Sequence, residues 1–176
     1  MRNLCLLLFM TVLVNVPALA SGIVPSFIEN DIPDARMVGA GRMTYLTMDI
    51  YDAALYAPQG RLSNERPLAL SLTYLRSLRG ARIAGRTVEE MRGQGFHDEL
   101  TLAAWHNTLQ EIFPDVGNGT TLTGVLKKDG TTIFYRDGVE IGRIADPRFG
   151  QRFFSIWLAP DTTEPALRRR LLATSE

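Results

Sequence analysis

Six short segments with the side-chain pattern of β-strands constrain the fold of this chain most strongly. They are rich in Val, Ile, Thr and Tyr or alternate apolar with polar residues, as strands do. They cover about residues 36–46, 48–57, 68–75, 120–126, 132–136 and 139–144. Asp-Gly pairs at 129–130 and 137–138 predict hairpin turns between the last three segments. The first two segments are also expected to form a hairpin, although no Asn-Gly or Gly-Gly marks its turn.

Helical patterns lie between and after these segments. Thr87 and Glu90 have the spacing of a capping box, so we expect a helix to begin at Thr87. It is expected to end near Gly93 and Gly95. Further helices are expected over about residues 98–113, 147–158 and 163–172. Strands with helices set between and after them predict an α+β domain with an antiparallel sheet.

Residues 1–20 have the parts of a secretory signal peptide. Arg2 and the amino group are positive, residues 4–14 are almost wholly apolar, and residues 18–20 have the small-x-small form that a signal peptidase accepts. The apolar run is too short to span a membrane. We therefore expect residues 1–20 to be removed and residues 21–176 to form one domain. That domain is expected to be periplasmic or secreted, with no transmembrane segment after cleavage.

The composition argues against several classes of function. The 19 Lys and Arg residues balance 19 Asp and Glu residues, which gives no general attraction for nucleic acid or for an anionic membrane. The single cysteine, Cys5, falls in the signal peptide, so the mature chain can form neither an intrachain disulfide nor a cysteine zinc site. The two histidines, His97 and His106, lack the spacing of a metal pair, and we expect no metal site.

Arg42, a charge within an apolar strand, is the residue most open to a functional interpretation. If the hairpin turns near Thr47, Arg42 lies within one residue of facing Tyr51. A guanidinium beside a phenol can hold a carboxylate or an enolate. The alternative is a structural salt bridge from Arg42 to Asp49 or Asp52. These two aspartates are three apart on a strand, so we expect them to point to opposite faces.

Three other features each allow a structural and a functional interpretation. Gly39 and Gly41 lack the third glycine of a dinucleotide loop and open a strand, so we interpret them as a bulge or a close backbone approach. A basic cluster is either a solvated face or the rim of an anion site; it consists of Arg76, Arg79, Arg82 and Arg86. Four aromatic residues at helical spacing are expected in the core rather than around a ligand; they are Trp105, Phe153, Phe154 and Trp157.

Several stretches resemble the chalcone isomerase-like family, in particular its bacterial secreted branch. They are VGAGRMTYLTMDIYDAALYAP, EEMRGQGF, IFPDV, FYRDGVEIGRI and FFSIWLAPDTTEPALRRRLL, and the resemblance covers about residues 36–172. It implies an open-faced sandwich, in which a layer of helices covers a large antiparallel sheet. It also implies a ligand cleft between sheet and helices and no cofactor. Plant enzymes of the family close a chalcone to a flavanone, whereas non-enzymatic relatives hold a fatty acid by an Arg and a Tyr.

The resemblance implies roles for two residues. Arg42 matches the family arginine, although the segment between Gly and Arg is one residue shorter here, and Tyr51 matches the tyrosine of the fatty-acid binders. The first hypothesis is binding of a small apolar carboxylate, such as a fatty acid, by Arg42 and Tyr51. One alternative is a cofactor-independent isomerase acting on a chalcone-like enone, with Arg42 stabilising developing charge. The other is a structural protein whose cleft is filled by its own aromatic side chains.

Overall fold

The computed structural model describes residues 24–62 and 67–173, so the expected signal peptide lies outside the described residues. The elements, in chain order, are α1 (Ser26–Asp31), β1 (Ala35–Tyr45), β2 (Met48–Pro58), β3 (Leu68–Tyr74), α2 (Gly80–Gly93), α3 (Glu99–Ile112), β4 (Thr121–Leu126), β5 (Thr132–Arg136), β6 (Val139–Ile144), α4 (Pro147–Leu158) and α5 (Pro165–Leu171). All six expected strands are present, with bounds within one residue of the prediction.

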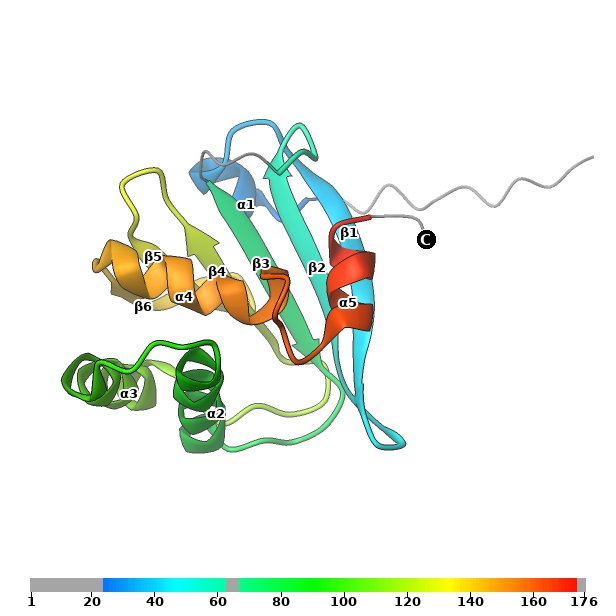
Figure 1. The fold of residues 1–176 in the computed structure, drawn as a ribbon. Helices are drawn as coiled ribbons and strands as arrows, with labels where there is room; N and C mark the ends of the chain where they lie inside the picture. Colours follow the sequence, from blue (N-terminus) through cyan, green and yellow to red (C-terminus); the bar gives the residue numbers. More distant parts are fainter. Residues whose placement is uncertain (1–23, 63–66, 174–176) are drawn as a thin grey trace, which may run out of the picture.

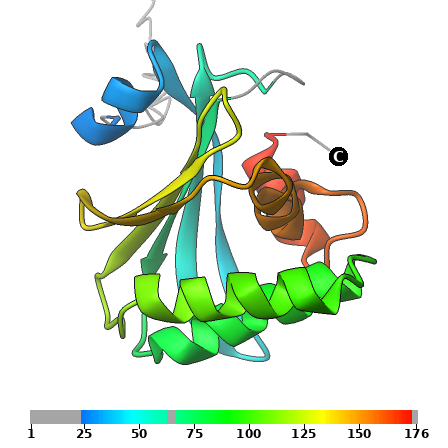
Figure 2. The ribbon, with the colours of Figure 1, turned by 90° about the vertical axis from the view of Figure 1, so that its left-hand side faces the viewer.

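The six strands form one sheet in the order of the sequence, and every neighbouring pair is antiparallel. Helix α1 lies on one face of the sheet, and helices α2 to α5 lie on the other (Figure 1, Figure 2). This arrangement confirms the α+β class and the open-faced sandwich. None of the described helices is long and apolar enough to cross a bilayer.

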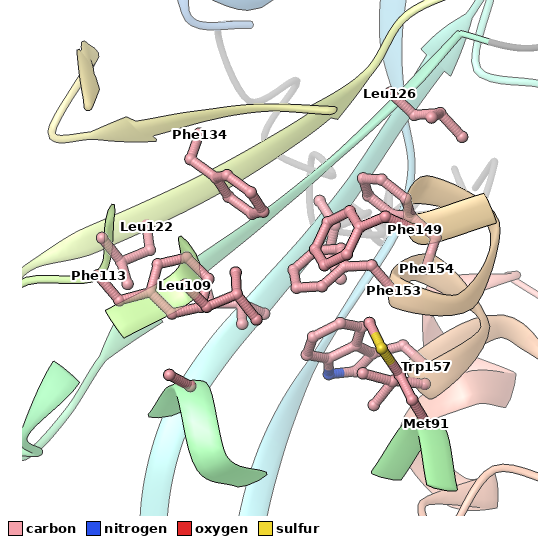
Figure 3. Close-up of a cluster of buried hydrophobic side chains, with 14 of the residues drawn as sticks. Met91, Leu109, Phe113, Leu122, Leu126, Phe134, Phe149, Phe153, Phe154 and Trp157 are labelled. Atoms are coloured by element: carbon pink, nitrogen blue, oxygen red, sulfur yellow. The ribbon is translucent and has the colours of Figure 1, made fainter. Parts of the chain in front are cut away.

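An aromatic layer fills the space between the sheet and helix α4. Phe149, Phe153 and Phe154 are buried and lie beside Phe134 of β5 (Figure 3). The ring centroids of Phe134 and Phe153 are 5.3 Å apart and nearly perpendicular, which is a favourable edge-to-face contact. Burial of each such side chain contributes about 1.5–3 kcal/mol, so this layer is a major source of stability. The expected aromatic core residues are all buried here or, for Trp105, against Phe149.

A smaller cluster holds α1 on the opposite face. Ile28 and Ile32 are fully buried against Tyr56 and its neighbours on the sheet. Asp31, at the end of the helix, accepts a 2.6 Å hydrogen bond from the Tyr135 hydroxyl and pairs with Lys127. Because this short helix depends on contacts with distant strands, the local sequence did not indicate it.

Helix α2 begins at Gly80, about two turns before the predicted start at Thr87. Thr87 is buried inside the helix, where its hydroxyl donates to the carbonyl of Ile83, so the expected capping box at Thr87 is wrong. The backbone N–H of Gly80 donates instead to the Asp115 carboxylate at 2.9 Å. A residue 35 positions away thus satisfies the first turn, and local spacing could not reveal it.

Gly39 and Gly41 are positions of close backbone approach, as predicted. Helix α5 crosses β1 at these residues (Figure 1). A Cβ on Gly39 would overlap the carbonyl oxygen of Arg170 and lie 2.5 Å from that of Leu171. A Cβ on Gly41 would lie 2.9 Å from Cβ of Arg170. Helix α5 can pack this closely on β1 because Gly39 and Gly41 have no side chains.

Replacing Gly39 with Ala is expected to lower the free energy of unfolding by about 1–3 kcal/mol, because the backbone of α5 cannot yield to the new methyl group. Gly93→Ala is the matched control, because a Cβ at Gly93 meets nothing within 4 Å. Urea unfolding of the two variants measures the difference. Equal stability of both variants would contradict the close-packing role of Gly39.

Candidate functional site

The register of the β1–β2 hairpin places Arg42 and Tyr51 on opposite faces of the sheet. Arg42 lies opposite Asp52, and Tyr51 lies opposite Met43. Successive side chains of a strand point to opposite faces, so Tyr51 and Asp52 diverge. Tyr51 points to the helices, because its hydroxyl accepts a 3.0 Å hydrogen bond from Nε1 of Trp157 in α4. Arg42 therefore points away from them.

Arg42 forms a salt-bridge network at the surface. Its Nε and Nη2 donate to the two carboxylate oxygens of Asp52 at 2.6 and 2.9 Å, and its Nη1 donates to Asp49 at 2.8 Å. The hydrogen bond from Arg42 holds the pKa of Asp52 below its usual value. The Arg42 side chain is 47% exposed, so it is neither buried nor part of the apolar layer. The structural alternative for Arg42, a salt bridge, is the one that the geometry shows.

A β-bulge explains why both aspartates reach Arg42. Thr44 pairs with Asp49 although Met43 pairs with Tyr51, so Ile50 is an extra residue on β2. The extra residue turns Asp49 to the same face as Asp52. The expectation that the two aspartates point to opposite faces is wrong for this reason.

The two residues predicted to bind one ligand are thus not brought together. The hypothesis that Arg42 opens into the apolar space beside Tyr51 does not fit the geometry, because the sheet separates them. Contact of either residue with a ligand stays a prediction.

Tyr51 belongs instead to a polar cluster on the inner face of the sheet. Its ring packs edge-to-face on Tyr74, with centroids 5.8 Å apart. Burial raises the pKa of Tyr51 to about 12, and the hydrogen bond from Trp157 only partly opposes this shift. The phenol therefore keeps its proton at neutral pH. Because its oxygen accepts from Trp157, its proton is available to an acceptor.

A buried carboxylate from helix α2 helps to raise the pKa of this phenol through its charge. Glu90 is only 8% exposed. Arg86, one helical turn earlier, donates to one of its oxygens, and the Thr163 hydroxyl lies 3.3 and 3.2 Å from the two. The hydrogen bonds from Arg86 and Thr163 offset the free-energy cost of removing the Glu90 carboxylate from water.

Glu164, next to Thr163, adds a second carboxyl group. Burial and the charge of Glu90 raise its pKa, while Arg86 opposes that rise. The charges of Glu164 and Glu90 also raise the pKa of Tyr51, and the charge of Arg86 lowers it. We call this set the Tyr51 cluster; it consists of Tyr51, Arg86, Glu90, Trp157, Thr163 and Glu164.

Local sequence patterns point to these residues only in part. Arg86 was part of the basic cluster considered as an anion rim. Glu90 was assigned to a capping box, Trp157 to the core, and Thr163 and Glu164 to a helix start. A charged residue such as Glu90, next to the buried Met91 and Val88, is the signal that could have indicated a buried polar site.

Metal sites and surface depressions are the other candidates in the described part of the chain. No three His, Cys, Asp or Glu side chains among those residues come together as metal ligands. Two surface depressions, of about 320 and 400 Å³, lie away from the aromatic layer. The first is lined by Asp34, Arg36, Gln59 and Arg61, and the second by Ser77, Leu78, Arg79 and Arg82.

Comparison with known proteins agrees with the fold. The model of a family described as chalcone isomerase-like matches residues 30–173. The chain belongs to the chalcone isomerase-like family. It is 29% identical over 140 residues to an uncharacterized protein of Haemophilus influenzae, covering 79% of this chain and 68% of that protein.

A solved structure shares this fold. It is the crystal structure of a fatty-acid binding protein of Arabidopsis thaliana, which superposes with a TM-score of 0.61. The match covers 80% of this chain and 87% of that chain at 11% sequence identity. At this identity the likeness establishes the fold and no more.

The Tyr51–Trp157 hydrogen bond can be tested by a double-mutant cycle. Tyr51→Phe is expected to lower the free energy of unfolding by about 1 kcal/mol or more, because it leaves the indole N–H of Trp157 without its acceptor. In a Trp157→Phe background the same change should cost less. Denaturant unfolding of the four proteins measures the coupling, and an equal cost in both backgrounds would contradict it.

Glu164 should make stability depend on pH. Because its pKa is raised in the folded protein, the folded state binds a proton more tightly than the unfolded state. The free energy of unfolding should therefore fall as the pH rises from 4.5 toward neutrality, and Glu164→Gln should flatten that fall. Glu99→Gln is the control, because the pKa of Glu99 is lowered and acts below this window. An unchanged slope in Glu164→Gln would contradict the assignment.

Proposed function

We propose that this protein is exported by its signal peptide and binds a small apolar carboxylate, such as a fatty acid, between the sheet and the helices. Membership of the chalcone isomerase-like family and a fatty-acid binding protein with the same fold support the proposal. In this proposal the carboxyl group lies at the Tyr51 cluster and the hydrocarbon chain lies in the aromatic layer.

The observation that carries the proposal is the placement of the Tyr51 hydroxyl at one end of an apolar layer. Ligand sites are typically apolar with a few polar groups that fix the orientation of the ligand. Here Trp157 belongs to both parts, since its ring packs on Phe153 and its N–H reaches Tyr51. Arg86 supplies the positive charge that a carboxylate requires.

Binding requires rearrangement of two kinds. The carboxyl group of the ligand would compete with Glu90 for Arg86, because Glu90 already accepts from that guanidinium. The hydrocarbon chain would displace aromatic side chains of α4, because Phe153 and Trp157 are buried in the space that the chain would occupy. The Glu164 carboxyl, whose pKa is raised chiefly by burial, repels a further negative charge while it is ionised, so binding is expected to strengthen as the pH falls and this group takes up a proton.

Titration calorimetry with lauric acid tests this proposal. Arg86→Ala is expected to weaken binding about tenfold, because a charge-assisted hydrogen bond is lost. Tyr51→Phe, which loses a neutral hydrogen bond, should weaken it about fivefold.

Arg42→Ala is the matched control, since it removes an arginine from the outer face. It should bind lauric acid as the wild type does. Loss of affinity in Arg42→Ala together with full affinity in Arg86→Ala and Tyr51→Phe would reject the inner site and favour the original assignment of Arg42.

One observation favours a second candidate, a structural protein with a filled cleft. The rings of Phe149 and Phe153 are stacked 5.5 Å apart beside Phe134, so the described residues already occupy the space between sheet and helices. Mass spectrometry of lipid extracted from the purified protein separates the two candidates. A co-purified fatty acid supports binding, whereas no extracted lipid and no heat on titration support the filled cleft.

A further inference from the structure

The tip of the β1–β2 hairpin carries an exposed apolar surface that the proposed function does not use. Tyr45 is 59% exposed, Leu46 80% and Met48 41%. The hairpin reaches beyond the end of β3 (Figure 1). We call Tyr45, Leu46 and Met48 the hairpin tip.

The backbone of the tip is strained at Leu46. Leu46 has a φ of +56°, in the left-handed region that glycine and asparagine occupy more readily. Neither stability nor solubility explains a leucine at this exposed turn, because asparagine would serve both better. The position therefore indicates a binding role for the side chain.

One arginine contacts the tip, and two more lie at the start of α2. Arg76 reaches Met48, with its Nη1 2.8 Å from the sulfur. Arg79 and Arg82 are exposed and line the 400 Å³ depression together with Ser77. Within residues 24–62 and 67–173, these three arginines make no ion pair with a carboxylate.

Three carboxylates of the hairpin and of the segment that pairs with the start of α2 are engaged by other groups. Asp49 and Asp52 are bound by Arg42, and Asp115 accepts the backbone N–H of Gly80. The start of α2, with Arg79, lies at the same end of the molecule as the hairpin (Figure 1). This end therefore combines a protruding apolar point with three arginines that pair with no carboxylate of the described residues.

We propose that the hairpin tip inserts into the surface of a lipid bilayer that contains anionic phospholipids. A convex apolar point fits a fluid bilayer, whereas docking on a protein would require a matching hollow. Tyrosine is favoured at the membrane interface, and leucine gains free energy from leaving water. Arg76, Arg79 and Arg82 would contact lipid phosphates, for which guanidinium groups are well suited.

The same geometry connects the membrane to the Tyr51 cluster, and this step alone rests on the proposed function. Tyr51 is three residues from Met48 along β2, which is about 10 Å. Arg79, Arg82 and Arg86 are spaced three and four residues apart, so they follow one side of α2 toward Glu90. An amphipathic carboxylate could thus pass from the bilayer to the cluster along a row of positive charges.

Vesicle co-sedimentation tests the insertion without any fatty acid. The exported protein is used, with its N-terminus checked by mass spectrometry so that no leader peptide can insert. We expect binding to vesicles of phosphatidylcholine and phosphatidylglycerol, and weaker binding to phosphatidylcholine alone. Leu46→Asn should lower the partition coefficient about tenfold while keeping the fold, because asparagine accepts the backbone conformation.

Leu100→Asn is the matched control, because Leu100 on α3 is 87% exposed and lies outside the tip. It should bind vesicles as the wild type does. The double variant Arg79→Gln/Arg82→Gln should lose the preference for phosphatidylglycerol.

Three outcomes would overturn the insertion: no vesicle binding by the wild type, undiminished binding by Leu46→Asn, or an equal loss in Leu100→Asn. Tyr51→Phe separates this proposal from the proposed function. It should bind vesicles normally, so failure of lauric acid binding and failure of membrane binding are independent results.

Discussion

The register of the β1–β2 hairpin decides which side chains of this protein can meet a ligand. Alternation along β2 sends Tyr51 to the helices and Asp52 to solvent, and Arg42 follows Asp52 because the two residues are paired. One extra residue, Ile50, then brings Asp49 to the same guanidinium. A shift of one residue would reverse every one of these positions. The same β1–β2 register therefore places Arg42 and its aspartates on the outer face and the Tyr51 phenol on the inner face.

The inner face combines a packed apolar layer with a compact polar cluster, and each depends on the other. The aromatic side chains of α4 exclude water from the sheet, and this burial raises the pKa of Tyr51. In return, the hydrogen bond from Trp157 to Tyr51 fixes where α4 lies against β2, and the hydrogen bond from Thr163 to Glu90 ties α2 to the segment before α5. A protein of this family can in this way place a hydrogen-bond donor at the end of an otherwise apolar interior.

Much of the fold could be predicted from local patterns, because strand alternation and Asp-Gly turns are local properties. The start of α2 and the existence of α1 could not, since the partners that stabilise them, Asp115 and Tyr135, are far away in the sequence. The geometry of the site was less predictable. Ligand contact by Arg42 or Tyr51 stays a prediction, and the faces of the two residues depend on the register of β1 against β2, which the local sequence does not reveal. Glu90 could not be predicted as a site residue, because its burial and its contact with Thr163 arise only in the folded structure.

The central claim is that the ligand head group lies at Tyr51 on the inner face of the sheet. The crystal structure of the protein with a bound long-chain fatty acid tests it most directly. The account predicts a carboxyl group within hydrogen-bond distance of the Tyr51 hydroxyl and the Arg86 guanidinium, with the rings of Phe153 and Trp157 moved aside. A carboxyl group on Arg42 at the outer face, with the aromatic layer undisturbed, would contradict it.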